Sequence, residues 1–160
     1  MGLISMPKPI IDSEGNKRWY NEQGELHRED GPAVEYLNGT KEWYLNGKLH
    51  REDGPAFEAV NRSKEWWLNG QRHRPDGPAV EWADGTKEWW LNDKLHREDG
   101  PAIEWASGDT FWYLNGKLHR TNGPACEWDD RKEWWLNGKQ YTEEEFLLLQ
   151  FIKGVDIYVK

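Results

Sequence analysis

The heptapeptide HREDGPA occupies residues 27–33, 50–56 and 96–102, and close variants of it occupy residues 73–79 and 119–125. The five copies start at residues 27, 50, 73, 96 and 119, so the period is 23 residues. A second string, two aromatic residues followed by Leu-Asn and usually Gly, starts at positions 43, 66, 89, 112 and 134, and Trp19-Tyr20 is a looser first copy. A fixed period of this length is typical of a repeat array.

Each unit is predicted to contain two short strands joined by a turn. In one unit, residues 78–82 form a strand that begins with proline, where the missing N–H is tolerated. Asp84-Gly85 suits a tight hairpin turn, and residues 87–91 run back. Residues 92–100 contain Asn, Asp and Gly, which are turn formers, and cross to the next unit. The pattern therefore predicts a row of β-hairpins.

Composition favours a folded chain with an aromatic core. A net charge of −8 and a low aliphatic content are typical of disordered chains, but 12 tryptophans and an aromatic share of 14% are not. Each large ring can bury roughly 150–250 Å². The recurring tryptophans therefore replace aliphatic residues as the core of each hairpin.

The unit resembles the MORN repeat family. The matching pattern is Trp-x-x-Asn-Gly-Lys-x-His, then Asp-Gly, a short strand, a second glycine turn and an aromatic strand, and it covers most of the chain. A variant of this repeat occurs in bacterial antitoxin-like proteins, and the HREDGPA loop is similar to repeat proteins of phages and large DNA viruses. The resemblance implies hairpins aligned into one elongated, twisted antiparallel sheet.

The C-terminal stretch has a different pattern. Thr142 and Glu145 form a capping box, three glutamates occupy the first turn, and Gly154 suits a helix end. These features predict a largely apolar helix over 142–153, which we interpret as a cap on the open edge of the array. A partner-docking helix is the alternative, and residues 155–159 are expected to add a last strand.

The expected organisation has three parts: an N-terminal tail over 1–8, a MORN-like repeat array over 9–140 and a C-terminal cap over 141–160. The fold class is all-β, a single-layer elongated antiparallel sheet of about six β-hairpin repeats with a short C-terminal helical cap. The array begins at Pro9-Ile10-Ile11 without an evident cap, so a homodimer through this open sheet edge is a further expectation.

Alternation of side chains along a strand sorts the aromatic residues onto two faces. One face carries Trp, Leu and Val or Ile, and the other carries an aromatic stripe at Tyr20, Tyr44, Trp67, Trp90, Tyr113 and Trp135. Beside the stripe we expect a row of glutamates, Glu35, Glu58, Glu81, Glu104 and Glu127. A single sheet cannot bury both faces, so the stripe and these glutamates form the candidate partner-binding face. The alternative is that the rings only stack to hold the sheet together.

The HREDGPA loop is expected to be structural, with Arg paired to Asp and His hydrogen-bonded to a turn. Its members are His27, His50, His73, His96 and His119 together with Asp30, Asp53, Asp76 and Asp99. Equivalent histidines lie two strands apart, roughly 9.5 Å, which is too far to share a zinc ion at about 2 Å per bond. Cys126 occupies the position of Val80 and is expected to be a small core residue.

Repetition argues against catalysis, because a catalytic site needs one asymmetric cluster of groups in different environments. No catalytic residue, cofactor or metal is expected.

Phosphate-binding motifs are absent, and arginines such as Arg28 are followed by Glu and Asp, so nucleic acid is not an expected partner. The sequence has neither a long apolar run nor a signal-peptide pattern, so no membrane partner is expected. A single cysteine favours the cytoplasm of the producing or infected cell.

These observations favour a non-enzymatic protein-interaction module that presents an aromatic, acidic face to a basic protein. Its acidity would speed encounter with such a partner. The family resemblance points to an antitoxin, an inhibitor or a viral protein that acts on its host. The alternatives are a carbohydrate or cell-wall-binding repeat module, whose rings stack on sugars, and a structural component of an assembly.

Overall fold

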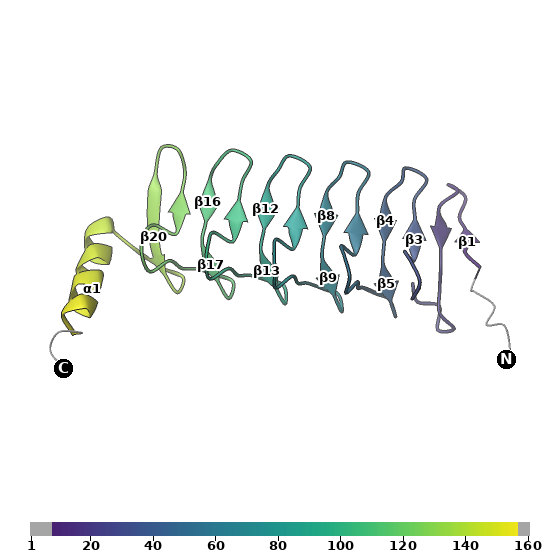
Figure 1. Ribbon diagram of the computed structural model, residues 1–160, viewed down its shortest axis with the longest axis horizontal. Helices are drawn as coiled ribbons and strands as arrows, with labels where there is room; N and C mark the ends of the chain where they lie inside the picture. The colour runs from purple at the N-terminus through teal and green to yellow at the C-terminus, as the bar shows by residue number, and fades with distance from the viewer. Residues whose placement is uncertain (1–7, 157–160) are drawn as a thin grey trace.

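The molecule is one elongated row of hairpins. The structure is a computed structural model that describes residues 8–156. Figure 1 shows successive units side by side from the N-terminal to the C-terminal end, with a single helix beyond the last hairpin. The main sheet has 13 strands, and each is antiparallel to its neighbour. This confirms the expected all-β class and the single elongated sheet.

Most strands span only two residues. In order across the main sheet they are β1 (Ile10–Ile11), β2 (Lys17–Arg18), β3 (Val34–Glu35), β4 (Lys41–Glu42), β7 (Phe57–Glu58), β8 (Lys64–Glu65), β11 (Val80–Glu81), β12 (Lys87–Glu88), β15 (Ile103–Glu104), β16 (Thr110–Phe111), β19 (Cys126–Glu127), β20 (Lys132–Leu136) and β21 (Lys139–Tyr141). Four further pairs are β5 (Tyr44–Leu45) with β6 (Lys48–Leu49), β9 (Trp67–Leu68) with β10 (Gln71–Arg72), β13 (Trp90–Leu91) with β14 (Lys94–Leu95), and β17 (Tyr113–Leu114) with β18 (Lys117–Leu118).

Each unit contains two hairpins where the sequence predicted one. The expected connection over 92–100 begins with the turn of the second hairpin, in which Asn92 and Asp93 have φ of 50° and 57°. The other units have Asn-Gly at this point, as at Asn46 and Gly47, with φ of 49° and 72°. Positive φ at both central residues gives the type I′ turn that joins two-residue hairpins, and Asn-Gly is its preferred sequence.

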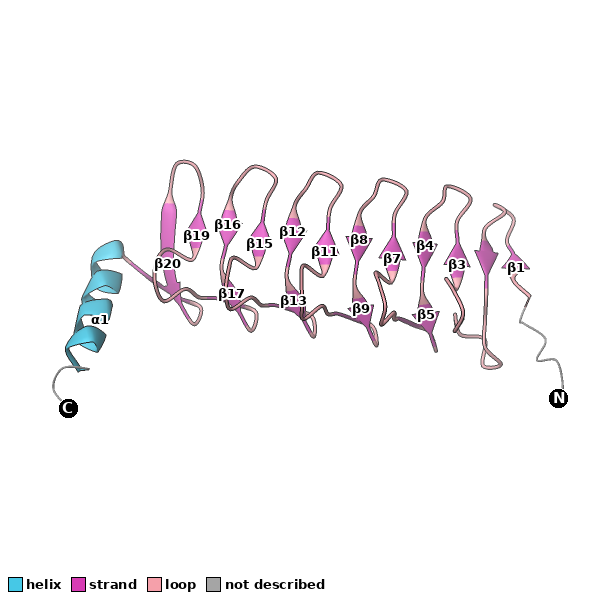
Figure 2. Ribbon diagram, in the orientation of Figure 1, coloured by secondary structure: helices cyan, strands magenta, loops and turns pink. Residues whose placement is uncertain are grey.

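The second hairpins form their own row, below the main sheet in Figure 2. Backbone hydrogen bonds join each one to the next. The amide of Gly47 donates to the carbonyl of Leu26 at 2.9 Å, and that of Gly70 donates to Leu49 at 2.8 Å. Every unit is therefore joined to its neighbours at two levels, through the main sheet and through this row.

Buried hydroxyl groups connect the turns of the main sheet. The Thr86 side chain accepts the amide of Ala106 at 3.1 Å and is 1% exposed. Ser63 accepts the amide of Ala83 in the same way at 3.1 Å. Because each turn donates to the one before it, successive units cannot slide along one another without leaving a buried amide unpaired.

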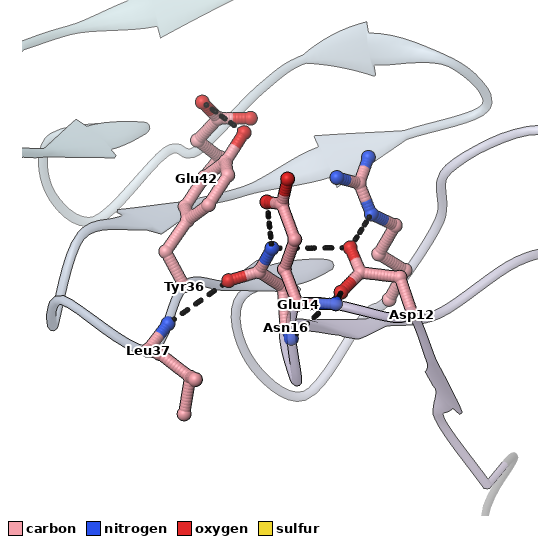
Figure 3. Close-up of polar contacts among 7 residues, drawn as sticks. Asp12, Glu14, Asn16, Tyr36, Leu37 and Glu42 are labelled. Carbon is pink, nitrogen blue, oxygen red and sulfur yellow. Dashed lines mark hydrogen bonds and ion pairs between the residues drawn. The ribbon is translucent and has the colours of Figure 1, made fainter.

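The first turn uses an amide side chain for the same purpose (Figure 3). Asn16 Oδ1 accepts the amide of Leu37 at 3.1 Å, and Asn16 Nδ2 donates to Asp12 at 3.1 Å. Arg18 Nε also donates to Asp12, at 3.3 Å. The hydrogen bond from the Asn16 side chain is the largest cause that lowers the pKa of Asp12, and the hydrogen bond from Arg18 lowers this pKa further.

The core is a thin row of small residues. The alanine of each heptapeptide is completely buried, at Ala33, Ala56, Ala79, Ala102 and Ala125. Cys126 packs at the position of Val80 and is 2% exposed. Burial raises the pKa of its thiol to about 12, so the thiol stays protonated. Larger aromatic side chains flank this row on both faces and are mostly half-buried.

The helix α1 (Glu143–Asp156) starts at the expected capping box. The Thr142 amide donates to Glu145 at 2.9 Å, and the Glu145 amide donates to the Thr142 hydroxyl at 3.2 Å. Phe146 is buried against the end of the array, whereas Leu147, Leu148, Phe151 and Ile152 are exposed. The helix therefore leaves much of its apolar surface uncovered, which differs from a cap that buries it.

The ends of the chain differ from the sequence interpretation in one respect. The expected last strand over 155–159 is wrong at its start, because α1 continues to Asp156. Residues 157–159 lie outside the described residues, as do residues 1–7 of the expected tail. The outermost strand, β1, exposes both Ile10 and Ile11, at 62% and 63%. Dimerisation through this edge stays a prediction.

Candidate functional site

The pairing register decides which side chains share a face of the sheet. Val80 lies opposite Glu88, and Glu81 lies opposite Lys87. Directly opposite residues share a face, so Trp90, two residues from Glu88, lies with Val80, and Glu81 lies on the other side. The expected placement of the Glu81 row beside the aromatic stripe is therefore wrong. A shift of one residue in pairing exchanges the two faces, and the five-residue loop over 82–86 sets this register.

We name the two faces by their recurring residues. The stripe face carries Tyr44, Trp67, Trp90, Tyr113 and Trp135. The arginine face carries the arginines of the HREDGPA loops, Arg28, Arg51, Arg74, Arg97 and Arg120, and the expected glutamates, Glu35, Glu58, Glu81, Glu104 and Glu127.

On the arginine face, one arginine joins four parts of each unit. Arg51 lies over the Trp43 ring at 4.2 Å and donates to Asp53 at 2.8 Å. It also donates to the carbonyl of Pro55 at 3.2 Å and to Glu58 at 3.1 Å. Arg28, Arg74, Arg97 and Arg120 make matching contacts. Their guanidinium groups lie over the rings of Trp19, Trp66, Trp89 and Trp112, and each donates to a proline carbonyl and to a glutamate, Glu35, Glu81, Glu104 or Glu127. Arg28, Arg97 and Arg120 also donate to Asp30, Asp99 and Asn122, and Arg74 forms an ion pair with Asp76 at 3.4 Å.

The loop histidines connect each unit to the following one. His50 Nδ1 accepts the amide of Asn69, which opens the next Asn-Gly turn, at 3.1 Å. His27, His96 and His119 accept the amides of Asn46, Asn115 and Asn137, and His73 Nδ1 lies 2.9 Å from Asn92 Oδ1. These contacts make the histidines part of the scaffold.

Shallow hollows repeat along the arginine face, each between two successive loops. One of about 440 Å³ has Trp66 and Leu68 in its lining, with Arg51 and Arg74 on its two sides. The sequence did not predict these hollows. Their arginines already donate to carboxylates and carbonyls of the chain, so these arginines are engaged in holding the loops.

The stripe face has glutamates of its own, from the second strand of each unit. Glu88 accepts the indole N–H of Trp90 at 2.8 Å and that of Trp82 at 2.9 Å, one on each carboxylate oxygen. The equivalent contacts are Trp67 to Glu65 at 2.9 Å, Trp135 to Glu133 at 3.0 Å and Tyr36 to Glu42 at 3.2 Å. Alternation along residues 87–91 already put Glu88 beside Trp90, and this signal was available from the sequence.

Burial changes the acidity of the tyrosines of the stripe. It raises the pKa of Tyr44 to about 12, and the neighbouring Glu42 carboxylate adds to this effect. Burial also raises the pKa of Tyr113. Both hydroxyl groups therefore stay protonated at neutral pH, and the negative charge of this face resides on its glutamates.

Two guanidinium groups of the chain itself lie against rings of the stripe face. Arg72 lies 4.9 Å from the Trp67 ring and 4.9 Å from the Trp90 ring, with Nε 3.7 Å from Glu65. Near the C-terminal end, Arg131 lies over the Trp128 ring at 4.0 Å, and Phe111 meets that ring edge-on at 5.1 Å. Cations therefore stack on these rings in the folded protein.

Two tryptophans of this face are more exposed than the rest. Trp82 is 42% exposed and Trp105 is 48% exposed. Both line a hollow of about 470 Å³ that also includes Glu88, Asp84 and Thr86. Neither tryptophan was among the expected binding residues, because the assumed register put Trp82 on the face opposite the stripe. The pairing of Val80 with Glu88 places it on the stripe face.

No family model matches the chain, and no curated protein matches it either. Over residues 8–156, no helix has the length and apolar character needed to cross a membrane. Within the same part of the chain, no three His, Cys, Asp or Glu side chains gather as a metal site.

Proposed function

We propose that the chain is a non-enzymatic protein-interaction module that binds a basic protein through its stripe face. The observation that carries this proposal is the arrangement of Arg72, which lies between two tryptophans of the stripe beside Glu65. A cation held between aromatic rings next to a carboxylate is how this surface would receive side chains of a basic partner.

The distribution of charge supports the same choice of face. On the arginine face, glutamates are matched by arginines and lysines, as at Glu58 with Arg51 and Lys41. On the stripe face glutamate recurs at Glu42, Glu65 and Glu88, and Glu65 has a cation beside it, Arg72 at 3.7 Å. An acidic, aromatic surface attracts a basic protein and accelerates its docking.

The class of partner follows from this chemistry. Proteins that act on nucleic acids carry basic surfaces, so a nuclease or another nucleic-acid-binding factor would be held away from its substrate. The role is that of an antitoxin, an inhibitor or a viral protein that acts on the host. Cys126, the single cysteine, is buried and free, as suits a reducing cytoplasm.

A peptide-display selection against the full chain tests the proposal. We expect cationic peptides to be enriched and to lose affinity for the variant Glu65→Gln with Glu88→Gln. The matched control, Glu52→Gln with Glu98→Gln, removes the same charge from exposed positions on the arginine face, and should bind nearly as well as the wild type. Enrichment of no cationic peptide, or equal losses in the two variants, would overturn the proposal. Binding on a glycan array instead would favour the carbohydrate alternative.

A further inference from the structure

We infer that the hollow lined by Trp82 and Trp105 binds one arginine side chain of the partner protein. This inference rests on the proposed function and names the residue that the stripe face recognises. It is argued from the position of the two rings, from a guanidinium that the chain itself holds in an equivalent setting, and from the carboxylates at the hollow.

Trp82 and Trp105 occupy the same position in successive units, each directly after the first strand of its unit. Equivalent residues lie two strands apart, roughly 9.5 Å. Both rings are exposed, at 42% and 48%, and both line the hollow of about 470 Å³. The pair therefore presents two indole rings of neighbouring units to the same open space.

The chain shows what such a pair of rings can hold. Trp67 and Trp90 are also equivalent residues of successive units, and the Arg72 guanidinium lies 4.9 Å from each ring. Its charge is balanced by Glu65 at 3.7 Å. Glu65 and Glu88 occupy equivalent positions in their units. The repeat spacing therefore accommodates a guanidinium between two indoles, with a glutamate of the second strand beside it.

Tyr36 and Trp128 occupy the position equivalent to Trp82 and Trp105 in their own units. Trp128 is covered by Arg131 at 4.0 Å, so one ring of this row already carries a guanidinium. The Tyr36 hydroxyl donates to Glu42 at 3.2 Å. Trp82 and Trp105 line an open hollow, whereas Trp128 has Arg131 over its ring.

The carboxylates favour a planar cation at this site. Each oxygen of Glu88 accepts one indole N–H, from Trp82 or Trp90, and each has a second lone pair left for a further donor. Asp84 lies in the same lining and accepts the Thr86 amide at 2.8 Å through one oxygen. Arginine offers five donors in a plane that also stacks on aromatic rings, whereas lysine offers a compact ammonium group. We therefore assign arginine to this hollow.

The test uses N-acetylarginine amide as the probe and N-acetylcitrulline amide as its neutral control of the same shape. Binding is followed in the full chain by the ¹⁵N-resolved indole N–H signals of Trp82 and Trp105. We expect these signals to shift with the arginine probe and to stay in place with citrulline. Trp105→Ala should weaken binding about fivefold or more, Glu88→Gln should weaken it as well, and Trp105→Phe, which keeps an aromatic ring, should retain most of it.

Equal shifts with the two probes, or an unchanged affinity in folded Trp105→Ala, would overturn the inference. Circular dichroism melting of each variant establishes that it is folded. Failure here is distinguishable from failure of the proposed function. If selected cationic peptides bind but the arginine probe does not affect Trp82 and Trp105, the inference alone is wrong. If the probe binds but no cationic peptide is selected, the proposed function is wrong, whereas the Trp82–Trp105 hollow is still a site that binds an arginine side chain.

Discussion

The guanidinium carbon of Arg51 lies 4.2 Å from the centre of the Trp43 ring, and the same side chain donates to Asp53, to the Pro55 carbonyl and to Glu58. One residue thus connects the loop, the start of the next strand and the half-buried Trp43 ring. A sheet with almost no aliphatic core depends on such contacts, and the repeat of 23 residues reproduces them along the array.

Replacing Arg51 by lysine should destabilise the protein by about 1–3 kcal/mol, because an ammonium group cannot stack and bind three acceptors at once. Urea denaturation followed by circular dichroism measures this change. The control is Arg62→Lys in an exposed turn, which should change the free energy of unfolding by less than about 0.5 kcal/mol. Equal effects in the two variants would show that the stacked arginine is dispensable.

Gly100→Ala should destabilise the protein by about 1–3 kcal/mol through overpacking. A Cβ atom at Gly100 would lie 2.5 Å from the guanidinium carbon of Arg97, so the stacked arginine would have to move. The steric origin is tested by a double-mutant cycle with Arg97→Ala. We expect alanine at position 100 to cost little once Arg97 is gone, and additive losses would contradict a direct clash.

Arg62→Gly should raise the melting temperature. Arg62 has φ of 77°, whereas the equivalent positions in other units are Gly39, Gly85 and Gly108. A left-handed backbone costs a residue with a Cβ atom roughly 1 kcal/mol, and glycine removes this cost. Differential scanning calorimetry measures the shift. An unchanged or lower melting temperature would mean that other interactions of Arg62 outweigh the backbone strain.

Thr86→Val should cost about 1–3 kcal/mol, because the buried amide of Ala106 loses its acceptor. Valine matches threonine in shape, so the change isolates the hydrogen bond. Thr110→Val is the control, since the Thr110 side chain forms no hydrogen bond within the described part of the chain. The free energies of unfolding of both variants come from urea denaturation, and a smaller loss in Thr86→Val than in the control would contradict the role of the hydroxyl.

Stability should fall in acid. Hydrogen bonds from Arg28 and Arg51 lower the pKa of Asp30 and Asp53. A carboxyl whose pKa is lower in the folded state stabilises the fold above its unfolded pKa, about 3.9, and this contribution is lost as the pH falls through the folded pKa. Urea denaturation as a function of pH should show a decrease below about pH 4. Asp53→Asn should be less stable at neutral pH and should lose less on acidification. An identical pH dependence would contradict this role of Asp53.

Much of the fold could be predicted from the sequence, because its signals are local. The period of 23 residues defines the units, proline and turn formers such as Asp84-Gly85 indicate the first hairpin of each unit, and Thr142 with Glu145 indicates the start of the helix. The second hairpin of each unit does not follow from the interpretation of residues 92–100 as a connection, although Asn-Gly in the other units is a strong signal for a type I′ turn.

The composition of the candidate face could be predicted only in part, because it depends on the register between strands. The stripe residues Trp67 and Trp90 do share one face, but the glutamates beside them are Glu65 and Glu88. Glu81 lies on the other face with Arg74. The number of residues in a hairpin loop determines which residues pair. The length of the loop over 82–86 became known only from the structure.

The measurement that tests the proposed binding face most directly is hydroxyl-radical footprinting of the full chain with a selected cationic peptide. Mass spectrometry gives the oxidation of each tryptophan with and without the peptide. We predict that Trp82 and Trp105 become protected, while Trp66 and Trp89 on the arginine face keep their rates. Protection of Trp66 and Trp89 with Trp82 and Trp105 unchanged would contradict binding through the stripe face.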